Sequence, residues 1–149
     1  MARLPPITSK DQVAADHRTI FDSIVQSRGA VQGPFTLFLH SPELAGRVAH
    51  LGAFVRFEGS LDMRVRVLAA MTVAREFQAV YVGGPDWPRP PTIMAIRDHS
   101  RGVPPEDAEI IELTRQLLRR HRVDDASAKA MLARFGYDGF IELTGAIGY

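Results

Sequence analysis

The side chains able to transfer protons or hold a metal are spread thinly along this chain of 149 residues. Its five histidines show none of the short spacings that place two imidazoles on one metal ion. They are His17, His40, His50, His99 and His121. The chain has no cysteine, which excludes disulfides, thiolate metal sites and any peroxidase mechanism that uses a thiol. We therefore expect no metal and no redox centre, and at most general acid–base chemistry.

Asp86 and Trp87 form the first candidate for such chemistry. They lie in residues 83–91, a stretch with four prolines and two glycines that cannot continue a helix. A carboxyl group beside an aromatic ring could act as a general acid. The alternative, which we favour, is a loop aspartate that caps a turn and a tryptophan that packs over the core.

Three further side chains, His40, Arg75 and Tyr81, could take part in an acid–base reaction. Arg75 could bind a carboxylate through both ends of its guanidinium group, or it could hydrogen-bond carbonyl groups at a helix end. Tyr81 could donate a hydrogen bond to an oxyanion, or it could lie in the core. His40 precedes a helix start, where a bond to the backbone is the alternative role. Together with Asp86, these residues form the predicted catalytic set.

The segments that must position these residues carry helix signals. Ser9 and Gln12 form a predicted capping box, and apolar residues follow at helical spacing until Gly29. Ser41-Pro42-Glu43 is typical of a second helix start. That helix should bury one apolar stripe, made of Leu44, Val48, Leu51 and Val55.

The C-terminal half shows the same kind of signal. Residues 61–80, with Ser60 as the expected cap, are apolar almost all round in their middle, as in a helix that is buried on most sides. Further helix starts are expected at Pro105 and at Asp124-Asp125, and Gly136 should separate the last two helices. No hairpin signal and no linker interrupt this order. The sequence therefore predicts a single all-α domain of six to eight helices.

The overall composition is that of an ordinary globular protein. Hydrophobic residues make up 46% and charged residues 23% of the chain, with a net charge of +1, so neither disorder nor a nucleic-acid partner is expected. No apolar run is long enough to span a bilayer, and the N-terminus lacks the apolar core of a signal peptide. We expect a cytoplasmic protein without membrane contact. The apolar segments 67–74 and 140–147 favour a homo-oligomer.

A series of short motifs runs through the chain in a fixed order. The N-terminal ones are Arg28-Gly29, Gly33-Pro34-Phe35, Leu39-His40-Ser41-Pro42-Glu43-Leu44 and Gly52-Ala53-Phe54-Val55-Arg56-Phe57-Glu58. The later ones are Ser60-Leu61, Thr72-Val73-Ala74-Arg75-Glu76, Arg134-Phe135-Gly136, Glu142-Leu143 and Ile147-Gly148-Tyr149. In their order and spacing they make the chain similar, over nearly its whole length, to the carboxymuconolactone decarboxylase-like family, in its decarboxylase branch.

This resemblance implies an alkylhydroperoxidase-like helical bundle that assembles as a trimer or hexamer and works without a cofactor. It also implies a reaction on a small carboxylated lactone, with His40 in a loop that lines the cavity. The substrate contacts that we infer with it are Phe35, Arg56, Trp87 and His99. For Arg56 we also weigh a structural role, a buried ion pair with Glu58 that fixes two helices.

The residues at the family's catalytic positions depart from its pattern. The early glutamate of the central helix is Val67 here, the second glutamate is Val82 and the histidine is Asp86, whereas the tyrosine is kept as Tyr81. The first cysteine of the peroxidase branch is Ala79, so peroxidase activity is excluded. We therefore expect a protein that is silent toward the family substrate. The alternative is a cofactor-free acid–base enzyme that uses the surviving residues.

The departure after Tyr81 has a form that a shifted reading frame would produce. With GC-rich codons, deleting two bases from the family text Tyr-Glu-Trp-Ala-Ala-His yields Tyr-Val-Gly-Gly-Pro, which is residues 81–85 here. We hypothesise a local double frameshift through residues 82–92. The coding DNA tests this hypothesis, because a shifted frame that does not read as a Trp-Ala-Ala helix would exclude it.

Overall fold

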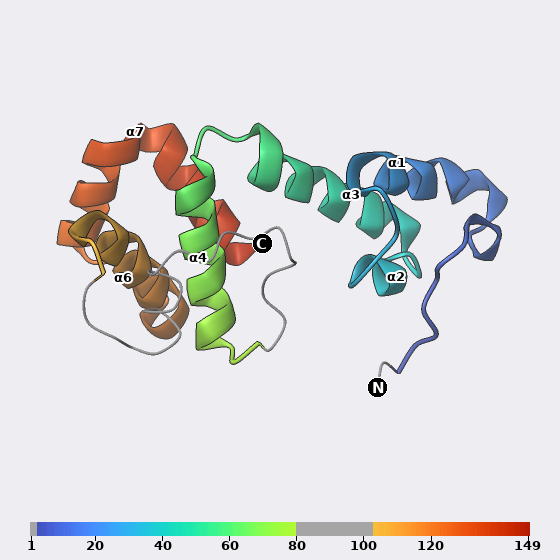
Figure 1. Cartoon of the computed structure of the whole chain (residues 1–149), viewed down its shortest axis with the longest axis horizontal. Helices are drawn as coiled ribbons and strands as arrows, with labels where there is room; N and C mark the ends of the chain where they lie inside the picture. The colour runs from blue at the N-terminus through green and yellow to red at the C-terminus, as the bar shows by residue number, and fades with distance from the viewer. Residues whose placement is uncertain (1–2, 80–102) are drawn as a thin grey trace. The chain divides into compact units, whose positions relative to one another are not determined.

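The computed structural model describes residues 3–79 and 103–149. All regular structure in these two ranges is helical (Figure 1), so the all-α class predicted from the sequence is confirmed for them. No helix within these ranges combines the length and the apolar character that crossing a membrane requires. The chain forms two compact units, Met1–Glu58 and Gly59–Tyr149, which are called the N-terminal unit and the C-terminal unit below.

The N-terminal unit is built from short helices joined by tight turns. In chain order these are the 3-10 turns η1 (Lys10–Gln12) and η2 (Ala15–His17), the α-helices α1 (Arg18–Arg28), α2 (Phe35–Phe38) and α3 (Pro42–Ala53), and the π-helical turn η3 (Phe54–Glu58). Gly29 ends α1 with a φ of 79°, and Pro42 occupies the first turn of α3. Both boundaries agree with the sequence signals.

The first α-helix starts later than the apolar spacing suggested. The predicted capping box is present, and the side chain of Gln12 accepts a hydrogen bond from the backbone N–H of Ser9 at 3.0 Å. It closes only one 3-10 turn, because Val13 and Ala14 are extended, with ψ angles of 137° and 144°. Val13 is nevertheless buried, so its apolar character reflects packing rather than a position on a helix.

The buried face of α3 is not the predicted one. Leu44 and Leu51 of the expected stripe are 49% and 48% exposed, whereas Ala45, Ala49 and Gly52 are buried. α3 packs on α1, and small residues at such a contact let two helix backbones approach closely. The prediction is therefore wrong for Leu44 and Leu51, whereas Val48 of the same stripe is partly buried and packs against the N-terminal core.

The C-terminal unit contains three long helices in the described ranges. They are α4 (Met63–Glu76), α6 (Pro105–Arg120) and α7 (Asp125–Gly148). Asp62 caps α4 and Asp124 caps α7, each accepting a hydrogen bond from the backbone N–H three residues further on, at 2.9 and 2.7 Å. The cap expected from Ser60 is therefore wrong. Ser60 instead donates hydrogen bonds from its backbone and its hydroxyl to Glu142 of α7, at 2.7 and 3.0 Å.

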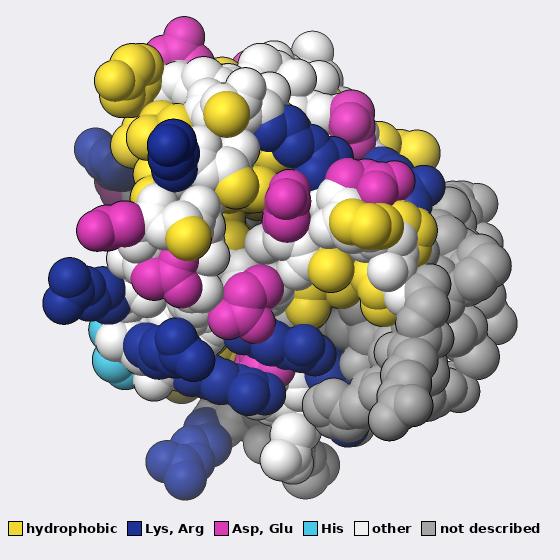
Figure 2. Space-filling view, turned by 90° about the vertical axis from the view of Figure 1, so that its left-hand side faces the viewer, with side chains coloured by type: hydrophobic (Ala, Val, Ile, Leu, Met, Phe, Trp, Pro, Cys, Tyr) yellow, Lys and Arg dark blue, Asp and Glu magenta, His cyan; other side chains and the backbone are white. Residues whose placement is uncertain are grey.

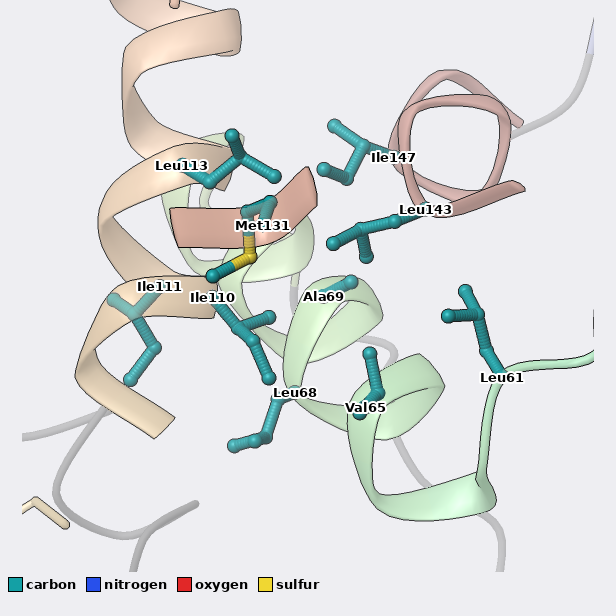
Figure 3. Close-up of a cluster of buried hydrophobic side chains, with 10 residues drawn as sticks. All are labelled: Leu61, Val65, Leu68, Ala69, Ile110, Ile111, Leu113, Met131, Leu143 and Ile147. Carbon is teal, nitrogen blue, oxygen red and sulfur yellow. The ribbon is translucent and has the colours of Figure 1, made fainter. Parts of the chain in front are cut away.

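Side chains from α4, α6 and α7 converge on one apolar core (Figure 3). Its buried members are Leu61, Val65, Leu68, Ala69, Ile110, Ile111, Leu113, Met131, Leu143 and Ile147. Leu113, Met131 and Leu143 are fully buried and point into the same space from α6 and α7. Burial of one such side chain stabilises the folded state by about 1.5–3 kcal/mol. Because the apolar side of each helix is held in this core, the polar residues of the same helices must lie on their other sides.

α7 bends at Gly136, where Figure 1 shows the helix changing direction. The φ of 68° and ψ of −173° at this residue lie in a region that only glycine adopts without strain. We predict that Gly136→Ala lowers the free energy of unfolding by about 1–2 kcal/mol. Asp138→Ala, an exposed position in the regular helix just beyond the bend, should change it by less than about 0.5 kcal/mol. Urea denaturation compares the two variants, and equal effects would contradict a strained backbone at Gly136.

Candidate functional site

Charged side chains meet at both ends of the contact between α4 and α6. At the start of both helices, the guanidinium group of Arg64 donates two hydrogen bonds to the carboxylate of Asp107, from Nε to Oδ1 at 3.0 Å and from Nη2 to Oδ2 at 2.5 Å. The Asp107 side chain is fully buried, whereas that of Arg64 is about half exposed. These hydrogen bonds raise the pKa of Arg64 above its ordinary value. Arg64 therefore stays charged at neutral pH and holds the first turns of the two helices together.

At the other end of the same helices, Glu76 is bound by two arginines of α6. Arg119 donates hydrogen bonds to it at 2.5 and 2.8 Å, and Arg115 donates one at 3.2 Å. The Glu76 side chain is only 10% exposed, and hydrogen bonding from Arg119 is the main cause that lowers the pKa of Glu76. Since the starts of α4 and α6 meet and their ends meet, the helices run parallel. We call their contact the α4–α6 seam.

Between these two charge clusters the fully buried residues of α4 carry no titratable group, whereas Arg66 and Arg75 are partly buried. The fully buried residues are Val65, Val67, Leu68, Ala69 and Thr72. The hydroxyl of Thr72 donates a hydrogen bond to the carbonyl oxygen of Leu68 in its own helix, at 2.8 Å, so it is already engaged. Val67, which the predicted motif alignment places where the family has its early glutamate, is 9% exposed. No side chain on this described face of α4 is titratable, so the face offers no general acid or base.

Two of the four predicted catalytic residues are described. Arg75 lies in the last turn of α4 and is partly buried. His40 belongs to the N-terminal unit, is exposed, and its Nε2 lies 2.8 Å from the carbonyl oxygen of Pro5. This contact corresponds to the backbone-bonded role considered as the alternative for His40. Tyr81 and Asp86 lie outside the described residues.

Two of the four predicted substrate contacts are also described. Phe35 is buried, and the guanidinium carbon of Arg28 lies 4.3 Å from the centre of its ring. This stacking is a cation–π contact that fixes both side chains. Arg56 is exposed in η3. Trp87 and His99 lie outside the described residues. Phe35 therefore has a packing role in the N-terminal unit, whatever else it contacts.

The structural role weighed for Arg56 is wrong. Arg56 and Glu58 both lie in η3, both are exposed, and within the described ranges no ion pair joins them. Residues two positions apart on a helical turn point to different sides, which explains why these opposite charges do not meet. A buried ion pair at this place is thereby excluded.

The motifs behind the family resemblance form packing and hydrogen-bonding contacts within each unit. In the N-terminal unit, Arg28 covers Phe35 and donates a hydrogen bond to the carbonyl oxygen of Ala49 on α3, at 3.1 Å. In the C-terminal unit, Ser60 is tied to Glu142 as described above. These motif residues join elements that are distant in sequence. Their spacing is therefore explained by the framework, without reference to any reaction.

The charged surface over α6 and α7 is mixed in sign. Figure 2 looks onto this side and shows Lys and Arg side chains gathered toward its lower part, with Asp and Glu side chains beside them. A nucleic-acid surface is typically uniformly basic, and this face is not. Within residues 3–79 and 103–149, no group of three or more His, Asp and Glu side chains is placed to hold a metal ion.

In the part of the chain that the structure describes, the regular structure is helical, and two charge clusters join the parallel helices α4 and α6 of the C-terminal unit. The chain matches no protein-family model and no curated protein. The resemblance to the carboxymuconolactone decarboxylase-like family therefore stays a prediction, carried by the order and spacing of the sequence motifs.

Proposed function

We propose that the chain is a divergent carboxymuconolactone decarboxylase-like protein that keeps the helical framework and is catalytically silent toward 4-carboxymuconolactone. The observation that carries the proposal is the apolar buried face of α4, where Val67 stands in place of a glutamate and is 9% exposed. A valine in that position can neither take up nor release a proton. The central helix thus provides packing where an active member would provide acid–base chemistry.

The chemistry of the family's reaction explains why a valine in place of the glutamate matters. Loss of carbon dioxide from a small unsaturated acid leaves an enolate, which needs a proton donor and a cationic or hydrogen-bonding partner. In the motif alignment, Val82 stands for a second glutamate and Asp86 for a histidine. Loss of one general acid–base group typically costs a factor of about 10²–10⁴ in rate. The losses do not add within one site, but together they leave little catalysis to expect.

The preserved framework supports family membership. Arg28, Ser60 and Glu142 belong to the motifs of the resemblance, and each takes part in a hydrogen bond with a residue far along the chain inside its own unit. Phe35, from another of these motifs, packs under the guanidinium group of Arg28. A chain can keep such contacts after its chemistry is lost, because fold and function are separable. The resemblance further implies a homo-oligomer, a trimer or a hexamer, that needs no cofactor and binds at most a small carboxylated molecule.

The test is a steady-state assay of the purified full-length protein on 4-carboxymuconolactone, beside its Asp86→Ala variant. We expect both proteins to leave the spontaneous rate unchanged, while far-ultraviolet circular dichroism shows that both are helical. An active family decarboxylase serves as the positive control. Turnover that vanishes in the Asp86→Ala variant would contradict silence and establish the alternative, a cofactor-free acid–base enzyme with Asp86 as its acid.

A further inference from the structure

His17 lies where the starts of α1 and α3 meet, between two carboxylates. It is the last residue of η2 and the N-cap of α1. Its Nε2 lies 3.7 Å from Oδ2 of Asp16, and its Nδ1 lies 3.8 Å from Oε1 of Glu43 in the first turn of α3. Both ring nitrogens of one imidazole therefore face an anionic oxygen.

The packing of α1 on α3 holds His17 and Glu43 together. About one turn further along both helices, Gly46 lies so close to Ile20 that an added Cβ atom would stand 3.3 Å from the isoleucine side chain. On the other side of Glu43, Arg47 donates hydrogen bonds to its Oε2 at 2.9 Å and to its carbonyl oxygen at 3.0 Å, which leaves Oε1 for His17. The contact between His17 and Glu43 is therefore fixed by a close helix approach and by a second charged partner.

The protonation state of His17 decides how well this arrangement is satisfied. A neutral imidazole carries one N–H group, so its other nitrogen turns a lone pair toward a carboxylate. The imidazolium ion carries two N–H groups and a positive charge, so it suits Asp16 and Glu43 at the same time. Charges then alternate in sign along the row of Asp16, His17, Glu43 and Arg47.

We propose that these four residues form a pH-sensitive clamp, called the His17 clamp below, which tightens the contact between α1 and α3 when the imidazole takes up a proton. By linkage, the added stability is present in mildly acidic solution and is lost as the pH rises through the range of roughly 6–7 in which histidines titrate. Carboxylates are ionised above about pH 5, which sets the acid limit of this range. The clamp lies in the N-terminal unit and does not rest on the catalytic silence proposed above.

The other charged groups around the start of α1 have contacts of their own. Lys10 binds Asp22 at 2.5 Å, Arg18 donates a hydrogen bond to the carbonyl oxygen of Val13 at 3.3 Å, Asp11 is hydrogen-bonded by Ser9, and His40 lies 2.8 Å from the carbonyl oxygen of Pro5. The positive end of the α1 dipole disfavours a cation at the N-cap. Asp16 offsets this effect because its carboxylate stands at the same helix end, so Glu43 decides the sign.

Hydrogen exchange of the backbone amides in the full chain, read by mass spectrometry at roughly pH 5.5 and pH 7.5, tests the His17 clamp. After correction for intrinsic exchange, α1 of the wild type should be about two- to fivefold better protected than α1 of His17→Gln at the lower pH, the factor expected for one partly exposed ion pair. At the higher pH the two proteins should differ little. Glu43→Gln should lose the same pH dependence. His50→Gln, which removes an exposed histidine from α3, is the matched control and should keep it.

Three outcomes overturn the clamp. The first is a wild type whose protection of α1 depends on pH no more than that of His17→Gln. The second is a pH dependence that survives in Glu43→Gln or is lost equally in His50→Gln. The third is a wild type that is less protected than His17→Gln at the lower pH, because the helix end would then outweigh Glu43. If circular dichroism shows that His17→Gln has lost helix, Glu43→Gln alone decides, since it leaves the imidazole in place.

Discussion

Replacing Asp107 by alanine should lower the free energy of unfolding of the C-terminal unit by about 2–4 kcal/mol. The Asp107 carboxylate is fully buried and accepts both hydrogen bonds of the Arg64 guanidinium group. Hydrogen bonds that involve charged groups contribute about 1.5–3 kcal/mol each. The Arg64 side chain is half exposed, so in the Asp107→Ala variant its guanidinium group can hydrogen-bond to water instead. This makes the loss of unfolding free energy smaller than for a fully buried pair. Denaturation by urea at neutral pH, followed by circular dichroism, measures the effect.

Two variants control this measurement. Asp138→Ala removes an exposed aspartate of α7 and should change the free energy of unfolding by less than about 0.5 kcal/mol. Asp107→Asn keeps the side-chain volume and one acceptor, so its effect should fall between those of the two alanine variants. If Asp107→Ala and Asp138→Ala unfolded at the same urea concentration, the Arg64–Asp107 pair would not be what holds α4 to α6.

Helix boundaries were predictable where their signals act over a few residues. Pro105 in the first turn of α6 and the Asp124 cap of α7 work through local backbone geometry. For α4 the sequence predicts Ser60 as the cap, whereas the structure has Asp62 in that role, although both residue types are good caps. The choice depends on Glu142, which lies far along the chain and binds Ser60. A local signal could not contain that information.

The buried face of α3 shows that helical periodicity alone does not decide which side of a helix is buried. The helix has one face with Leu44 and Leu51 and another with Ala45 and Ala49, and helical spacing alone is compatible with burial of either. Hydrophobicity favours the leucines, so the sequence predicts that their face is the buried one. Close approach to α1 selects the alanines instead, because helix contacts are decided by shape as well as by apolar area.

The charge clusters of the α4–α6 seam could not be found from the sequence. Arg64 and Asp107 are 43 positions apart, as are Glu76 and Arg119, and each residue type is usual on a solvated helix face. Only the parallel register of α4 and α6 brings them together, and no local pattern encodes that register. The apolar burial of Val67, in contrast, followed from the apolar run around it, so the part of the candidate site that depends on composition was predictable.

The second large effect is expected at Glu76. Glu76→Gln should lower the free energy of unfolding by about 2–3 kcal/mol at neutral pH, because it removes the charge that Arg115 and Arg119 share. The carboxylate is only 10% exposed and receives three hydrogen bonds from these two arginines. Arg119 is more than half exposed, and solvent screening of its charge keeps the expected value below that of a fully buried pair.

The pH dependence identifies the electrostatic origin of this stability. Hydrogen bonding from Arg119 lowers the pKa of Glu76 in the folded protein from its ordinary value of 4.5, so the unfolded chain binds the proton more readily than the folded one. The stabilisation is then fully present above pH 4.5, and it is lost as the pH falls through the lowered pKa of the folded state. The difference in unfolding free energy between wild type and Glu76→Gln should accordingly stay constant from neutral pH to about pH 5 and shrink in more acidic solution. Glu109→Gln, on the exposed side of α6, should show almost no difference at any of these pH values. A gap for Glu76→Gln that persisted undiminished far below pH 4.5 would mean that packing, and not charge, accounts for the role of Glu76.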